Sequence, residues 1–158
     1  MNFHKIFDNQ RGAAAVETAI IFMLLMMFIF GIIEFGLLLF DKHILTNASR
    51  EGARAGIVVG LSRTGDECLS DDSCPDDWYR GVAESVASDF CATYLVGFGS
   101  SLEEPEIFTS FTNFDSNINP SRGDALTVSL TYSYNFLFLS ALGLGPVTLD
   151  AVSTMQLE

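Results

Sequence analysis

Two carboxylates interrupt a long apolar stretch near the start of the chain. Residues 13–40 read AAAVETAIIFMLLMMFIFGIIEFGLLLF, and Glu17 and Glu34 are the only charged side chains among them. An ionised group in a membrane helix is costly, so it usually has a partner or a function. The two glutamates are therefore the first candidates for functional residues.

Glu34 lies toward the far end of this stretch. It is six residues from Phe40, which is about 9 Å along a helix, so its carboxylate could reach the outer membrane interface and stay solvated. It also points about 100° around the helix from Glu17, so the two carboxylates do not form one polar stripe. A contact with a partner is the alternative interpretation, and the sequence leaves both open.

All three cysteines follow the apolar stretch. Cys68 and Cys74 flank a polar loop, LSDDS, and Cys91 lies farther along the chain. In an oxidising compartment Cys68 and Cys74 are the natural disulfide pair, which leaves Cys91 as the odd thiol. Spacing alone does not establish the connectivity, and a buried Cys91 is as compatible with the pattern as a bonded one.

The segment 61–77 is polar and acidic. Carboxylate oxygens suit calcium, but the regular spacing of an EF-hand loop is absent. We therefore interpret the segment as a solvated loop and assign no metal site, with calcium at Asp66–Asp77 as the alternative. The acidic side chains concerned are Asp66, Glu67, Asp71, Asp72, Asp76 and Asp77.

Catalytic patterns are not found. The only histidines are His4 and His43, which leaves little material for a nucleophile–histidine–acid triad. The sequence contains no phosphate loop, zinc-ligand cluster or dinucleotide fingerprint. We expect a protein that is not an enzyme and has no cofactor. A net charge of −12 also argues against nucleic acid as a partner, because phosphates would repel the chain.

The apolar stretch predicts a retained membrane helix. Thr18–Phe40 would span about 34 Å, enough to cross a bilayer and too long for a signal-peptide core. Asp41-Lys42-His43 follows it in place of a cleavage site. Helical spacing of small and apolar residues continues beyond, so we predict one helix over residues 13–60, half inside the membrane and half outside.

The orientation of this helix is weakly encoded. Lys5 and Arg11 precede it, and Lys42, Arg50 and Arg54 follow it, so the positive charges nearly balance. We favour a cytoplasmic N-terminus, because the acidic, cysteine-bearing part of the chain then lies outside.

A second helix is predicted from Asp76 or Asp77 to about Leu95. Its apolar side chains recur every four residues and predict a core-facing stripe. The stripe consists of Trp78, Val82, Val86, Phe90 and Tyr94. In the first helix, Gly52 and Gly56 either allow a partner to approach closely or only weaken the helix.

The rest of the chain changes to a period of two residues. Alternation over 124–136 and 147–152 predicts half-buried strands, and 106–114 is a third. Residues 119–123 are predicted to form a turn between strands. Residues 137–146 are apolar, and we expect a loop that packs on the membrane or on another subunit. The predicted fold class is α+β, with two helices and a small antiparallel sheet.

Three motifs together resemble the TadE-like family, pilin-like minor components of tight-adherence (Flp) pilus systems. The motifs are RGAAAVE at 11–17, GIIEFG at 31–36 and NASREGARA at 47–55. The resemblance implies a leader peptide (1–12), a transmembrane and extended helix (13–60) and an extracytoplasmic domain (61–158). It also implies cutting by a prepilin peptidase between Gly12 and Ala13. Glycine leaves the backbone open there, although Thr18 replaces the aromatic residue that many members carry after the glutamate.

The cut would give Glu17 a specific partner. The new α-amine of Ala13, on the same chain or on a neighbouring subunit, could pair with the Glu17 carboxylate and relieve the cost of burying both charges. Solvation of Glu17 at headgroup level is the alternative. The resemblance further implies a minor pilin of the inner membrane or the fibre, whose partners are other pilin-like subunits, the assembly platform and the peptidase. A membrane-anchored adhesion module and a secretion-system pseudopilin are the alternatives.

Overall fold

The computed structural model describes residues 4–62, 78–96, 104–112 and 123–157. Two helices, three strands and one short 3-10 helix make up an α+β fold, as predicted. The acidic loop with Cys68 and Cys74 and most of the predicted turn at 119–123 lie outside the described residues.

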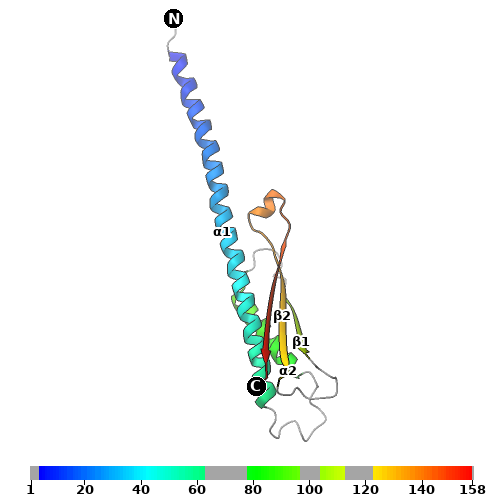
Figure 1. The fold of residues 1–158 in the computed structure, drawn as a ribbon. Coiled ribbons are helices and arrows are strands. Elements are labelled where there is room, and N and C mark those ends of the chain that lie inside the picture. The colour runs from blue at the N-terminus through cyan, green and yellow to red at the C-terminus, as the bar shows by residue number, and fades with distance from the viewer. Residues whose placement is uncertain (1–3, 63–77, 97–103, 113–122, 158) are drawn as a thin grey trace.

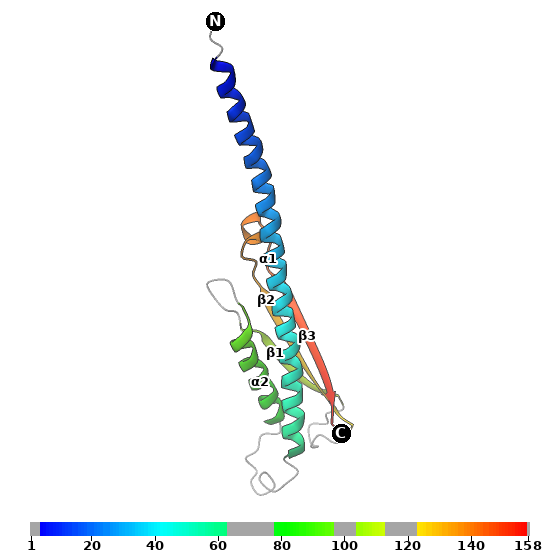
Figure 2. The same cartoon turned by 90° about the vertical axis from the view of Figure 1, so that its left-hand side faces the viewer.

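Helix α1 (His4–Ser62) is the longest element, and it is one continuous rod (Figure 1). Its N-terminal half projects away from the rest of the chain, and its C-terminal half lies against the other elements (Figure 2). The helix contains no proline, the residue that most often breaks or kinks a helix. It is long and apolar enough to cross a membrane, and its most apolar window is only 6% buried.

Strands β1 (Glu106–Thr112), β2 (Ala125–Tyr134) and β3 (Val147–Gln156) form one antiparallel sheet with β2 in the centre. In the β2–β3 ladder, Ala125 pairs with Gln156 and Tyr134 pairs with Val147. All three predicted strands are confirmed, and β3 continues beyond the predicted end because it pairs along the whole of β2. The alternating residues predicted for β2 are buried in the core, namely Leu126, Val128, Leu130, Tyr132 and Tyr134.

Helix α2 (Trp78–Tyr94) packs against α1 and β1. The predicted core stripe is shifted by one position from the buried one: Tyr94 at its end is 52% exposed, and Val82, Val86 and Phe90 are half-buried. The side chain of Trp78 lies outside the described part of the structure. The buried residues of α2 are Tyr79, Ala83, Ala87 and Cys91, which also recur every four residues. Cys91 is a free thiol, and burial raises its pKa to about 11.

Two glycines explain why small residues face the core. A Cβ atom at Gly52 would lie 2.8 Å from the backbone oxygen of Ala83 and 3.1 Å from the Cβ of Ala87. A Cβ atom at Gly56 would lie 3.1 Å from the Cβ of Ala83. Of the two interpretations of this glycine pair, the structure supports close approach, and the element that approaches is α2 of the same chain. It leaves room only for alanines on the facing side of α2.

Strand β1 is attached to α2 by a polar contact. The Thr109 hydroxyl is buried, donates to Glu84 Oε1 at 2.7 Å and accepts from Arg80 Nε at 3.1 Å. These contacts hold the edge strand β1 against α2. The sheet is therefore bound to both helices, to α2 through β1 and to α1 through β2 and β3.

Replacing Gly52 by alanine should destabilise the fold. Alanine is a better helix former by about 1 kcal/mol, but the clash with the Ala83 backbone should cost about 1–3 kcal/mol. The free energy of unfolding, measured by urea titration and circular dichroism in detergent micelles, checks this. Gly81→Ala is the control, because a Cβ there meets nothing within 4 Å. It should be neutral or stabilising, and equal effects of both variants would contradict the close approach.

Candidate functional site

The Glu34 carboxylate is buried between α1 and the end of β2. Its side chain is 0% exposed. Oε1 accepts hydrogen bonds from the Leu137 amide at 2.6 Å and from the Tyr134 hydroxyl at 3.3 Å, and Oε2 accepts one from the Phe138 amide at 2.8 Å. We call these four residues the Glu34 clamp.

The clamp provides hydrogen-bond acceptors for two backbone amides that lie beyond the end of the sheet. The β2–β3 ladder ends at the pair of Tyr134 and Val147, so the amides of Leu137 and Phe138 have no strand partner. Buried amides without an acceptor are destabilising, and a carboxylate is a strong acceptor. Glu34 supplies this acceptor from a helix about a hundred residues earlier in the chain. Within the described residues Glu34 forms no salt bridge, so its carboxylate is stabilised by these hydrogen-bond donors alone.

This geometry corrects one expectation about Glu34. Solvation at the outer interface is wrong, because the carboxylate is fully buried. Its contact is with the same chain. A role of Glu34 in assembly stays a prediction.

Asp41 is a second buried carboxylate on the same face of α1, and sequence reasoning missed it. It is 0% exposed, and Oδ1 accepts from the Val96 amide, just after α2, at 3.1 Å. Its Oδ2 atom is buried and has no hydrogen-bond partner among the described residues. Its spacing in the sequence could have indicated burial, because Asp41 lies seven residues after Glu34 and four before Leu45, and this spacing places all three on one helix face.

The segment held by the clamp, residues 137–146, is the tip of the β2–β3 hairpin, and we call it the hairpin tip. It contains the 3-10 helix η1 (Leu139–Leu142) and lies beside α1 in both views (Figures 1 and 2). The ring of Phe138 stacks on the ring of Phe30, with centroids 4.3 Å apart and planes 15° apart. Lower down, Lys42 Nζ donates to the backbone oxygen of Asp150 and joins α1 to β3.

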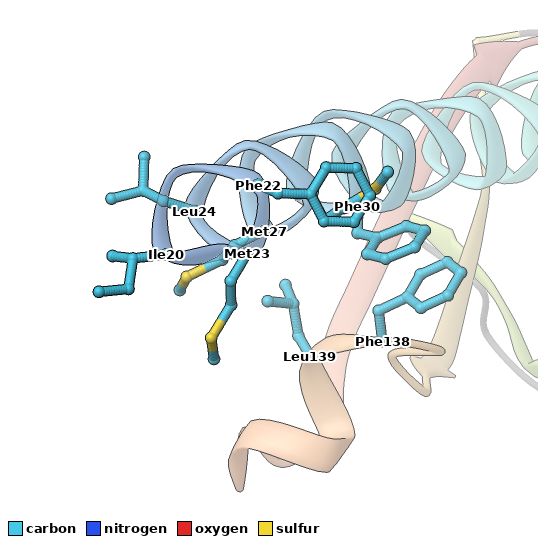
Figure 3. A pocket seen from close by; sticks show the side chains of 10 residues that line it. Ile20, Phe22, Met23, Leu24, Met27, Phe30, Phe138 and Leu139 are labelled. Carbon is cyan, nitrogen blue, oxygen red and sulfur yellow. The ribbon is translucent and has the colours of Figure 1, made fainter. Parts of the chain in front are cut away.

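An apolar groove runs between the hairpin tip and α1. Its volume is about 700 Å³. Figure 3 shows Leu139 pointing toward the helix and the Phe138 ring facing Phe30. Every lining residue is apolar: Ile20, Phe22, Met23, Leu24, Met26, Met27, Phe30, Gly31, Phe138 and Leu139. Such a groove can hold hydrocarbon, and it offers no group for chemistry on a polar substrate.

The predicted processing residues lie elsewhere, on the projecting half of α1. Gly12, Ala13 and Glu17 are exposed, and Glu17 has no hydrogen-bond or ion-pair partner among the described residues. The Thr18 hydroxyl donates to the backbone oxygen of Ala14 at 2.9 Å. Glu17 is seventeen residues, or about 25 Å, from Glu34 along the helix, so the two carboxylates are not brought together.

A metal centre has no support in the described part of the chain, where no three His, Cys, Asp or Glu side chains are grouped to hold an ion. The acidic segment Asp66–Asp77 lies outside that part, so the calcium alternative is untested by the structure.

Comparison with known families finds a match in the N-terminal part of the chain. The family model described as TadE-like protein matches residues 12–54, which confirms the resemblance. The match runs along α1 from the expected processing site through Glu17, Glu34 and Gly52. Neither a curated protein nor a solved structure matches the chain.

Removing the Glu34 carboxylate should loosen the hairpin tip. Glu34→Ala leaves two amides without an acceptor, which costs about 1–3 kcal/mol each when they are buried. Hydrogen exchange at Leu137 and Phe138 should accelerate by about tenfold or more, since about 1.4 kcal/mol corresponds to a factor of ten. The amides of Val128 and Leu130 in β2 should keep their protection.

The neighbouring variant Phe35→Ala is the matched control. Phe35 is exposed, lies about 100° around the helix from Glu34 and takes no part in the clamp. Exchange at Leu137 and Phe138 should stay at the wild-type rate in this variant. Wild-type exchange in Glu34→Ala as well would show that the carboxylate does not hold the hairpin tip.

Proposed function

Because its N-terminal segment is TadE-like, we propose that the chain is a minor pilin-like subunit of a tight-adherence (Flp) pilus system. It would act in assembly, initiation or adhesion of the fibre. The observation that carries this proposal is the shape of α1. Its N-terminal half exposes many large apolar side chains, and only the hairpin tip lies against them among the described residues, while its other half packs into the core of an α+β domain. An apolar surface of this size needs lipid or other subunits around it.

The proposed topology is a single pass through the inner membrane. The leader, residues 1–12, stays in the cytoplasm with Lys5 and Arg11, and the domain of residues 61–158 lies outside the cytoplasm. The outer half of α1 joins this domain. Two features support the arrangement: the apolar helix is long enough to cross, and the acidic part of the chain lies beyond it.

Gly12 fits a role in processing better than a role in the fold. A Cβ atom at this position would meet nothing within 4 Å, in contrast to Gly52 and Gly56, where close packing requires glycine. The chain's own packing therefore gives no reason for glycine at position 12. A peptidase that must reach the backbone between Gly12 and Ala13 would supply one.

After such a cut, the Glu17 carboxylate could pair with the new α-amine of Ala13. It is exposed and without a partner in the described residues, so no internal contact has to break before it pairs. Ala13 and Glu17 are four residues apart on one helix face, so pairing within a chain and pairing between subunits are both sterically open. Either pairing would remove the cost of carrying an ammonium or a carboxylate alone into an apolar assembly.

Processing can be tested directly. When the full chain is co-expressed with an active prepilin peptidase, N-terminal sequencing and intact mass should show a protein that starts at Ala13. An inactive peptidase, or a Gly12→Val variant whose side chain blocks the backbone, should leave residues 1–12 attached. Intact Met1–Gly12 on protein isolated beside the active peptidase would refute the processing proposal.

Glu17→Ala should reduce incorporation into fibres by about tenfold or more, since an unpaired buried charge costs several kcal/mol. The measurement compares the amount of protein in sheared fibres with the amount in the membrane. Thr18→Ala is the control, because its hydroxyl bonds only to its own helix. If the protein is only a membrane-anchored adhesion module, Glu17→Ala should leave surface display intact and no fibre-bound pool should exist in the wild type.

A further inference from the structure

The hairpin tip has the composition of a segment that avoids water. Residues 137–146 read LFLSALGLGP and contain no charged side chain. Leu137 and Leu144 are 43% and 52% exposed. Leucines at the tip of a hairpin are costly in water, and they lie beside the most apolar part of the whole chain.

The position of the hairpin tip along α1 matches the outer edge of a bilayer. A hydrocarbon core of about 30 Å takes about 20 helical residues, so a span that begins at Ala13 ends just before Glu34. Phe30, which stacks on Phe138, is four residues or about 6 Å inside that edge. A span counted from Thr18 would place the tip deeper still.

Several backbone amides of the tip have acceptors within the chain, which lowers the cost of placing the tip in a low-dielectric environment. Glu34 accepts the first two amides, Leu137 and Phe138. The Gly143 amide donates to Ser140 O at 3.0 Å, and the Leu144 amide donates to Leu139 O at 3.3 Å. Pro146 has no amide to satisfy.

The groove beneath the tip is continuous with the projecting face of α1. Its lining side chains from Ile20 to Gly31 belong to the helix segment that would face acyl chains. The groove is open and entirely apolar, so its natural filling at this depth is hydrocarbon.

We infer that the hairpin tip is a second membrane-inserting element, which dips into the outer leaflet beside α1 while lipid acyl chains fill the groove. The depth is shallow, about 5–10 Å, as for interfacial segments. The Glu34 clamp at the membrane edge holds the tip at this depth. The inference rests on the proposed membrane anchoring of α1, and the experiment below separates the two.

The test uses single tryptophans in the full-length chain. Trp78 is the only native tryptophan, so Trp78→Phe gives a clean background. Leu144→Trp then probes the hairpin tip, in phosphatidylcholine vesicles whose lipids carry bromine on one acyl chain. We expect blue-shifted emission and quenching of roughly twofold, stronger when the bromines lie near the headgroup end than near the methyl end.

Two further sites in the same background serve as controls. Phe28→Trp replaces an exposed residue of the apolar half of α1, about 9 Å inside the edge at Glu34, and should be quenched at least as strongly as Leu144→Trp. Val152→Trp replaces an outward residue of β3 that is 65% exposed, and should be unquenched. Leu137→Trp repeats the measurement if Leu144→Trp disturbs the circular dichroism spectrum.

The outcomes are distinct. Quenching of Leu144→Trp and Phe28→Trp but not of Val152→Trp supports the inference. Quenching of Phe28→Trp alone overturns it and leaves the anchoring of α1 intact. Blue-shifted Leu144→Trp emission without quenching means that a second copy of the chain covers the tip, which also overturns it. Absence of quenching at Phe28→Trp removes the anchoring and the inference together.

Discussion

The buried carboxylate of Glu34 is the interaction on which the upper part of the structure depends. A strand ladder that ends beside an apolar helix leaves backbone amides without a strand partner. One acceptor with two oxygens satisfies both free amides and a hydroxyl. The same contact fixes where the hairpin sits along α1, so the stacking of Phe138 on Phe30 and the groove beneath them follow from it.

The lower part of the structure is set by a different constraint, the near contact of two helix backbones. Gly52 and Gly56 bring α2 so close that only alanines fit opposite them. Once α2 lies there, its polar side reaches β1 through Thr109. Two kinds of residue on α1 thus have different roles. The carboxylates of Glu34 and Asp41 bind the backbone just after β2 and just after α2, and the glycines set the distance between α1 and α2.

Local patterns in the sequence predicted the elements, and contacts between distant residues were what it could not predict. An unbroken apolar run predicted α1, and strict alternation predicted β2 and β3. The inner face of α2 was misassigned because alanine is less hydrophobic than the neighbouring Val82 and Val86. Which face of α2 is buried depends on Gly52 and Gly56 of α1, which accept only small side chains opposite them. The donors to Glu34 lie a hundred residues away, so no local pattern could reveal its burial. The family match extends along α1 only, and the sheet was inferred from its own periodicity.

The continuity of α1 has a geometric consequence for the whole molecule. One proline-free helix passes from the projecting apolar half into the core without a linker. No loop therefore separates the projecting half of the helix from the domain that packs on its other half. A tilt or axial rotation of the projecting half would change the orientation of the sheet as well, because both are joined to the same helix.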